Sequence, residues 1–248
     1  MIGQLLMRGL LAGLVAGILA FCFAYVFGEP SVDAAIVFEE QMAAAEPADP
    51  GAIEEEPLVS RPVQSSWGLL TGILILSVGL GGVFAILFAC AYGRLGALSA
   101  AQASLLLAAI GFISFSLVPW LKYPANPPAS TFDDTIVYRT DLYFLILAIS
   151  LALGYGAWML RQQLLPGLGA WNASVIAGLG YVVAVAVVFL IMPAVNETPE
   201  TFPATVLWEF RIASLGIQFV LWAGIGLVFG SLAGRVLDRD GTSRIAAA

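Results

Sequence analysis

The sequence predicts an all-α integral membrane protein, folded as a six-helix transmembrane bundle in a single polytopic membrane domain over residues 1–248. The first observation is composition, because 60% of the residues are hydrophobic and only 11% are charged, whereas soluble domains carry about 25% charged residues. The second is a series of apolar runs, each close to the roughly 20 residues that cross a hydrocarbon core about 30 Å thick. These runs predict spans at residues 5–27, 67–92, 101–121, 141–160, 173–192 and 208–236.

Polar residues between the runs set the predicted boundaries. The first run carries Arg8 near its start and resembles a signal peptide, but its apolar part is longer than usual and no A-x-A pattern precedes Gly28. We therefore expect it to remain as a membrane anchor. Arg94 and Arg161 mark tight polar turns after the second and fourth runs. The proline-rich stretch 124–128 prevents the third helix from continuing.

The distribution of charge predicts the orientation in the membrane. An even number of spans places both termini on one side, and that side holds the majority of the arginines. The stretch from Glu29 to Glu56 contains nine carboxylates and no arginine, which is typical of an exported loop. We expect an acidic external loop at 28–66 that is partly disordered, and a short cytoplasmic tail at 237–248. The net charge of −7 argues against a nucleic-acid partner.

The residue types also exclude several kinds of chemistry. The chain contains no histidine, which removes the commonest transition-metal ligand and the commonest general base. Its two cysteines, Cys22 and Cys90, lie inside predicted spans, and we interpret them as small apolar fillers rather than as a redox or metal pair. The GxxxxGKS/T, GxSxG, HExxH and CxxC motifs are all absent from the sequence. The sequence therefore predicts neither an ATPase nor another enzyme.

Glycines recur every four residues in the first and last predicted spans. Small residues at this spacing line one face of a helix and let a neighbouring backbone approach closely. We interpret these glycines as packing positions within the chain, with oligomer formation as the alternative. They are Gly9, Gly13, Gly17, Gly226, Gly230 and Gly234.

Three exits on the predicted outer side share an outline. Pro30, Pro119 and Pro193 each follow an outgoing helix, and an arginine begins each returning helix, which fits three tandem helical hairpins. Carboxylates lie near these arginines, so two interpretations stay open: salt bridges that join the hairpins, or a polar vestibule that receives a cation. The candidate rim or pathway residues are Glu29, Arg61, Arg139, Asp141, Asn196, Glu209, Arg211 and Gln218.

Two of these candidates form a stripe on the last span. Arg211 and Gln218 are seven residues apart, close to two helical turns, and so share one face. The stripe either bonds a neighbouring helix or lines a route, with Arg211 orienting Glu29 or Asp141 and Gln218 offering its carbonyl oxygen to the ion. Lys122 stands among aromatic residues just beyond the third span, and we expect it to snorkel to the headgroup region.

Five stretches together resemble the CbtA family of probable cobalt transporter subunits. They are GEP at 28–30, FEE at 38–40, VSRPVQ at 59–64, LVPWLKYPANPP at 117–128 with TIVYRT after it, and MPAVNETPETFPATVLWEFRIASLGIQ at 192–218. The resemblance implies a multi-pass protein of a prokaryotic inner (plasma) membrane, linked to cobalt supply for cobalamin synthesis. It also implies a small one-helix, histidine-bearing partner subunit of the CbtB type. No metal-ligand set accompanies the resemblance, so the metal ligands are unknown at this point.

Coordination chemistry limits what this chain does alone. Cobalt(II) accepts imidazole and oxygen ligands, and oxygen ligands by themselves select it poorly against Mg²⁺ or Ca²⁺. We expect a membrane subunit that holds no bound cofactor and moves or admits a divalent metal ion across the lipid bilayer, with cobalt(II) implied by the resemblance. The alternative is a structural membrane protein that scaffolds a small metal-binding partner and has no transport path of its own.

Overall fold

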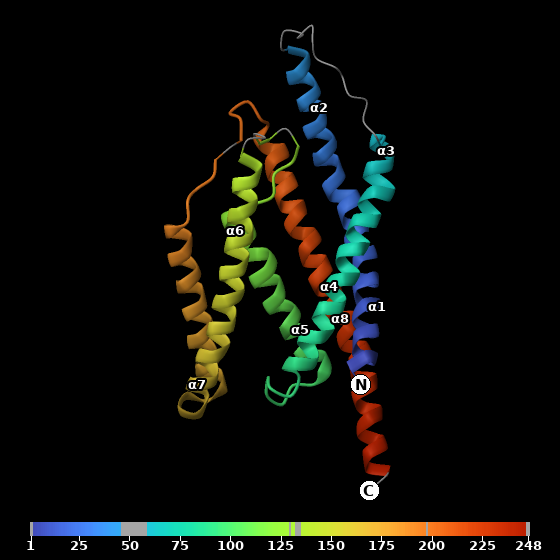
Figure 1. Cartoon of the computed structure of the whole chain (residues 1–248), viewed down its shortest axis with the longest axis vertical. Helices are drawn as coiled ribbons and strands as arrows, with labels where there is room; N and C mark the ends of the chain where they lie inside the picture. Colours follow the sequence, from blue (N-terminus) through green and yellow to red (C-terminus); the bar gives the residue numbers. More distant parts are fainter. Residues whose placement is uncertain (1, 46–58, 129, 132–134, 197, 247–248) are drawn as a thin grey trace. The chain divides into compact units, whose positions relative to one another are not determined.

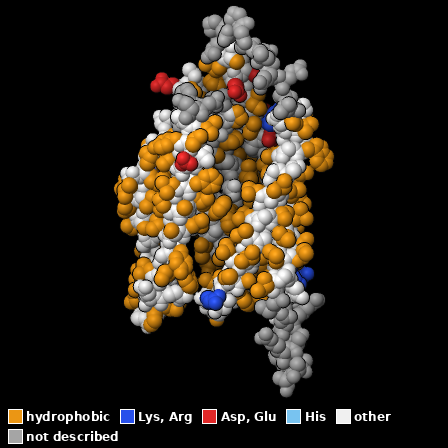
Figure 2. All heavy atoms as spheres, in the orientation of Figure 1, with side chains coloured by type: hydrophobic (Ala, Val, Ile, Leu, Met, Phe, Trp, Pro, Cys, Tyr) orange, Lys and Arg blue, Asp and Glu red, His pale blue; other side chains and the backbone are white. Residues whose placement is uncertain are grey.

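The computed structural model describes residues 2–45, 59–128, 130–131, 135–196 and 198–246. These residues form helices and connections, with no strand among them. Five helices are long and apolar enough to cross a membrane, judged by length and composition: Ile2–Ala45, Arg61–Ala91, Ala100–Lys122, Ile136–Ile191 and Ala204–Arg235. Hydrophobic side chains cover most of the face seen in Figure 2, as expected for a surface that meets lipid.

The elements follow in chain order (Figure 1). They are α1 (Ile2–Phe23), η1 (Ala24–Gly28), α2 (Glu29–Ala45), α3 (Arg61–Val63), η2 (Gln64–Gly68), α4 (Leu69–Ala91), α5 (Ala100–Gly111), η3 (Phe112–Leu117), α6 (Val118–Lys122), α7 (Ile136–Ile191) and α8 (Ala204–Ala246), where η denotes a π-helical turn. The chain divides into two compact units. Unit 1 comprises residues 1–109 and 203–248, and unit 2 comprises residues 110–202.

The region predicted as an external loop is partly helical. The first helix does not stop near Gly28 but continues through η1 into α2, which ends at Ala45. The disorder predicted for the loop concerns residues 46–58, which lie outside the described residues. At the other end, α8 runs to Ala246 and so extends through most of the predicted tail.

Two of the π-helical turns have the same relation to a proline. The Glu29 N–H donates to the Ala24 carbonyl, and the Val118 N–H donates to the Ile113 carbonyl, each bond reaching five residues back. The next residue in each case is a proline, which has no N–H and whose ring would clash with the carbonyl four residues earlier in a regular α-helix. A widened turn relieves this clash and lets the helix continue. The first two predicted exits are therefore built alike.

Unit 1 is organised around close contact between α1 and α4, which run antiparallel (Figure 1). A Cβ atom on Gly13 would overlap the backbone oxygen of Ser77 and lie 2.9 Å from its carbonyl carbon. A Cβ atom on Gly81 would overlap the backbone oxygen of Gly9 and lie 2.8 Å from the Gly13 Cα. Gly17 faces the side chain of Ser77 in the same way. The two backbones approach to a distance that only glycine allows.

The last helix, α8, packs on unit 1 along two faces. Gly224 faces α1, where an added Cβ would lie 2.9 Å from the Ala16 Cβ. Gly226 and Gly230 face α5, and the Ser104 hydroxyl donates a buried hydrogen bond of 2.7 Å to the Gly226 carbonyl. Gly234, the last glycine of the predicted stripe, has no described atom within 4 Å of its Cβ position.

Aromatic contacts join α8 to α4. The Phe229 ring lies edge-on to the rings of Phe84 and Phe88, at centroid distances of 5.4 and 4.9 Å. This edge-to-face geometry is favoured by the aromatic quadrupole. The helix α8 thus belongs to unit 1, whereas the arm of α7 that precedes it belongs to unit 2. The two helices of the third predicted hairpin, the second arm of α7 and α8, therefore belong to different compact units.

The two cysteines are free and exposed rather than buried as fillers. Cys22 lies near the C-terminal end of α1, and Cys90 lies near the C-terminal end of α4. Because α1 and α4 are antiparallel, the two thiols lie at opposite ends of the helix pair. This placement excludes a bond between them within one chain.

Unit 2 is built on α7, which is broken at Gly169. The backbone there has φ 73° and ψ 170°, a conformation that glycine adopts readily and other residues avoid. The two arms of α7 contact each other on either side of this break. The Ser150 hydroxyl lies 2.8 Å from the Tyr181 hydroxyl, and the Arg161 Nε donates to the Ser174 hydroxyl at 2.9 Å.

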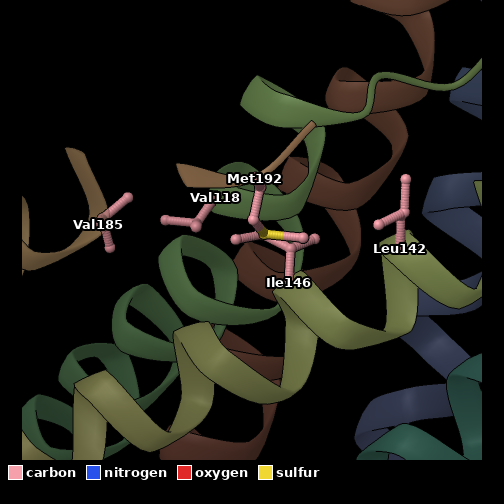
Figure 3. Close-up of a cluster of buried hydrophobic side chains, with 5 residues drawn as sticks. All are labelled: Val118, Leu142, Ile146, Val185 and Met192. Carbon is pink, nitrogen blue, oxygen red and sulfur yellow. The ribbon is translucent and has the colours of Figure 1, made fainter. Parts of the chain in front are cut away.

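A cluster of buried hydrophobic side chains joins both arms of α7 to α6 (Figure 3). Val118 comes from α6, Leu142 and Ile146 come from the first arm, and Val185 comes from the second arm. Met192, just beyond α7, completes the cluster. All five side chains are less than one tenth exposed. This cluster fixes the end of the second arm against α6.

Lys122 is the last residue of α6, and its ammonium group has defined hydrogen-bond partners in addition to the snorkelling that the sequence predicts. Its ammonium group donates hydrogen bonds of 2.8 Å to the carbonyl oxygens of Phe189 and Met192. The hydroxyl of Tyr123 donates a bond of 2.8 Å to the Pro193 carbonyl. The third predicted exit is thus tied to the second by hydrogen bonds within unit 2.

Candidate functional site

The charged residues that the structure brings together lie at the end of unit 1 where α2 and α3 begin. Glu29 and Asp33 are one helical turn apart and project from one face of α2. Arg61, the first residue of α3, reaches both: its Nε donates to Asp33 Oδ1 at 2.9 Å, and its Nη2 lies 2.8 Å from the same oxygen. The same Nη2 also forms an ion pair with Glu29 Oε2. We call Glu29, Asp33 and Arg61 the rim cluster.

The three side chains of the rim cluster differ in how far they are exposed to solvent. The Glu29 side chain is 12% exposed, Arg61 is 30% exposed and Asp33 is 61% exposed. A charge that is largely removed from water needs an opposite charge nearby, and Arg61 supplies it to Glu29. Two carboxylates share one guanidinium, so the cluster keeps an excess of one negative charge. Such a group can hold a cation if the arginine moves aside.

Three of the candidate residues, Glu209, Arg211 and Gln218, lie on α8, which packs in unit 1. A Cβ atom on Gly28 would lie 3.7 Å from Ile217 Cδ1, so the neighbouring Gln218 lies at the level of η1. Gln218 and Arg211 are both half-buried, whereas Glu209 is exposed. The contrast between Glu209 and Arg211 agrees with their spacing of two residues, which puts them on different faces of the helix.

The other candidates belong to unit 2. Arg139 is half-buried and Asp141 is exposed on the first arm of α7, and Asn196 is exposed in the connection between α7 and α8. The route interpretation has Arg211 orient Glu29 or Asp141, whereas in the structure Glu29 forms an ion pair with Arg61. Of the eight candidates, the described contacts join Glu29 and Arg61 directly.

Asp33 is the member of the cluster that sequence reasoning missed. It lies four residues after Glu29, a spacing that places two side chains on one helix face. That signal is useful only if residues 29–45 are helical, whereas the charge pattern predicts an external loop at 28–66. The composition of this stretch, which is rich in alanine and glutamate, favours a helix.

The cluster supplies oxygen ligands and no nitrogen ligand. Within the described residues, no group of three or more Asp, Glu, Cys or His side chains lies close enough to hold a metal ion. A transition metal with only two carboxylates around it would retain water or take ligands from elsewhere. The arrangement therefore fits weak, transient binding of a hydrated cation better than a permanent metal centre.

Comparison with known proteins agrees with these features. A family model described as "Probable cobalt transporter subunit (CbtA)" matches residues 2–234, which include the whole rim cluster and nearly all of the apolar helices. No curated protein and no solved structure gives a match. The matched range and the long apolar helices together identify a multi-pass membrane protein. The chain belongs to the CbtA family and is a probable cobalt transporter subunit that works within a complex.

Proposed function

We propose that this chain forms the membrane path of a transporter for cobalt(II), and that the rim cluster receives the ion at the outer end. The observation that carries this proposal is Arg61, which contacts both Glu29 and Asp33. Arg61 balances one of the two negative charges when no metal ion is present, and the two carboxylates lie one helical turn apart. An arriving divalent cation competes with Arg61 for the same oxygens.

The proposed topology has six crossings, because each arm of α7 crosses separately. Residues 170–191 form a helix of about 33 Å at 1.5 Å per residue, which is close to the thickness of the hydrocarbon core. The polar contact of Arg161 with Ser174 lies near the break at Gly169. This polar end is suited to the membrane surface.

We propose that the protein lies in a prokaryotic inner membrane with both termini in the cytoplasm, and the charges of unit 1 support this orientation. Because α4 and α8 both run antiparallel to α1, the ends that carry arginines in these helices lie together. At that end the side chains described in unit 1 include three arginines, Arg8, Arg94 and Arg235, and at the opposite end they include two, Arg61 and Arg211. The larger number of arginines at the first end follows the positive-inside rule. The opposite end also carries five carboxylates: Glu29, Asp33, Glu39, Glu40 and Glu209.

Single-cysteine labelling tests this orientation. In a chain with Cys22→Ala and Cys90→Ala, we expect Gln41→Cys to react with a membrane-impermeant maleimide added to intact cells. Ala97→Cys should react only after the membrane is permeabilised. Both positions are exposed, so access to the reagent depends on the side of the membrane. Labelling of Ala97→Cys alone in intact cells would reverse the topology.

The absence of histidine leads us to propose a partner that supplies nitrogen ligands. A small one-helix subunit of the CbtB type, which bears histidines, fits this need and would add selectivity for cobalt(II). We propose that the complex serves cobalt supply for cobalamin synthesis. The alternative is a scaffold in which the Arg61 ion pairs only join α2 to α3.

Uptake of radioactive cobalt(II) into proteoliposomes tests the proposed function against the scaffold. The purified chain is reconstituted alone and with the histidine-bearing subunit, with and without a proton gradient. We expect uptake above that of protein-free liposomes in at least the arm that contains both subunits. The partner without this chain is the control and should show none. If the complete complex takes up no cobalt with or without the gradient, the scaffold is correct.

A further inference from the structure

The C-terminal end of α7 has a carbonyl oxygen that its own helix leaves without a donor. The Met192 N–H makes the last helical bond, of 2.9 Å, to the Val188 carbonyl. The next bond would join residue 193 to the Phe189 carbonyl, but residue 193 is a proline and has no N–H. Lys122 donates to this carbonyl instead, at 2.8 Å. A charged side chain from α6 therefore replaces a missing backbone donor.

The surroundings of the Lys122 ammonium favour a positive charge. A helix C-terminus carries the negative end of the macrodipole, and Phe189 and Met192 present two carbonyl oxygens to the ammonium, each at 2.8 Å. The ammonium also lies 5.9 Å from the centroid of the Tyr123 ring, within the range of a cation–π contact. The neighbouring Pro193 carbonyl accepts from the Tyr123 hydroxyl and does not compete for the ammonium.

Tyr123 keeps its proton at neutral pH in this arrangement. Burial raises the pKa of its hydroxyl, and the nearby Tyr138 raises the pKa further. The hydroxyl therefore remains a donor to the Pro193 carbonyl. Both donors at this end of unit 2 come from consecutive residues, Lys122 and Tyr123.

The carbonyl oxygens are held in place by packing that does not involve the lysine. Met192 belongs to the buried hydrophobic cluster with Val118, Ile146 and Val185 (Figure 3). Pro193 fixes the backbone where the helix ends. The positions of the Phe189 and Met192 oxygens thus depend mainly on the core of unit 2. We expect them to persist when the lysine side chain is shortened.

We propose that the Phe189 and Met192 carbonyls form a binding site for a small monovalent cation of the ammonium class, and that Lys122 is its tethered occupant. By supplying the cation from the chain itself, the protein satisfies these oxygens without an ion from the medium. The site shares no residue with the rim cluster, and the proposal does not depend on cobalt transport.

Rescue by a free amine tests the site. Lys122→Ala should lower the thermal midpoint of the purified chain by about 5 °C, the size expected for loss of charged hydrogen bonds in a chain of this length. Methylammonium chloride should restore most of this loss, because it carries N–H donors on a cation small enough for the emptied space. Tetramethylammonium chloride at the same concentration has no N–H donor and should restore none.

Two matched variants keep the test decisive. Lys122→Met fills the space with an uncharged side chain, so it should lose stability without rescue by methylammonium, and it remains informative if Lys122→Ala does not fold. Tyr181→Phe removes a hydroxyl bond elsewhere in unit 2 and should not respond to methylammonium. Equal gains from methylammonium in Lys122→Ala, Lys122→Met and Tyr181→Phe would overturn the proposal. Unchanged stability of Lys122→Ala would also overturn it.

Discussion

Replacing Gly13 or Gly81 with alanine should lower the thermal midpoint of the folded chain by about 10 °C or prevent folding. Inserting a carbon atom into a packed core costs about 1–3 kcal/mol when side chains can adjust, and each kcal/mol shifts the midpoint by about 2–4 °C in a chain of this size. Here the added Cβ of Gly13 would overlap the backbone oxygen of Ser77, which cannot rotate away. Either substitution forces α1 and α4 apart along their length.

Glycines in the same helices provide the controls. Apart from its chain neighbours and its own helix backbone, a Cβ atom on Gly79 of α4, or on Gly3 of α1, would have no described atom within 4 Å. Gly79→Ala and Gly3→Ala should therefore keep or slightly raise stability, because alanine is favoured over glycine within a helix by about 1 kcal/mol. The measurement is thermal unfolding followed by tryptophan fluorescence in detergent. A loss in Gly79→Ala equal to that in Gly81→Ala would show that helix propensity, and not close contact, controls the effect.

These glycines also show how far the sequence predicts the fold. Repetition every four residues singled out Gly9, Gly13 and Gly17 because a helix places them on one face. The same spacing includes Gly234, which has no described neighbour within 4 Å of its Cβ position, and it misses Gly81. Helix periodicity shows which face of a helix carries the small residues. Which neighbouring helix packs against that face depends on the tertiary structure.

The lengths of the helices were harder to predict than the positions of the membrane spans. Hydropathy located a span at 101–121, and the structure has a helix from Ala100 to Lys122. It gave no sign that α2 continues the first span to Ala45, because a helix outside the bilayer needs no apolar run. The three-hairpin interpretation groups the fifth and sixth spans, whereas the second arm of α7 belongs to unit 2 and α8 belongs to unit 1. Short connections suggest which helices are neighbours without determining it.

The sequence predicts that charged residues lie at the rim, but it does not predict which of them form ion pairs. One of the two interpretations of the sequence was that salt bridges join the hairpins, whereas the ion pair of Arg61 with Glu29 lies within the first hairpin. Asp33 was missed because its position on the Glu29 face exists only once residues 29–45 are helical. Carboxylates near hydrocarbon need partners, but which partner lies in reach depends on where each helix begins.

The carboxylates of the rim cluster should matter for uptake more than the ion pair that they form with Arg61. We expect Glu29→Gln and Asp33→Asn each to lower cobalt(II) uptake roughly tenfold at limiting metal concentration, in proteoliposomes that contain the complete complex. Tenfold corresponds to about 1.4 kcal/mol, well below the roughly 4 kcal/mol that two unit charges 4 Å apart gain near a protein surface. Both substitutions keep the size of the side chain and remove one charge.

Arg61→Gln separates a cation site from a structural ion pair. It breaks the bonds to Glu29 and Asp33 as surely as the carboxylate variants do, but it leaves both carboxylates in place. If the cluster receives the ion, Arg61→Gln removes a competing charge, so the concentration of cobalt(II) that gives half-maximal uptake should fall, while Glu29→Gln should raise it. If the cluster only joins α2 to α3, all three variants should lose uptake in proportion to their lost thermal stability. That second pattern would show that the rim cluster is not part of the transport path. A structural role depends on the ion pairs of Arg61, whereas a binding role depends on the carboxylates alone.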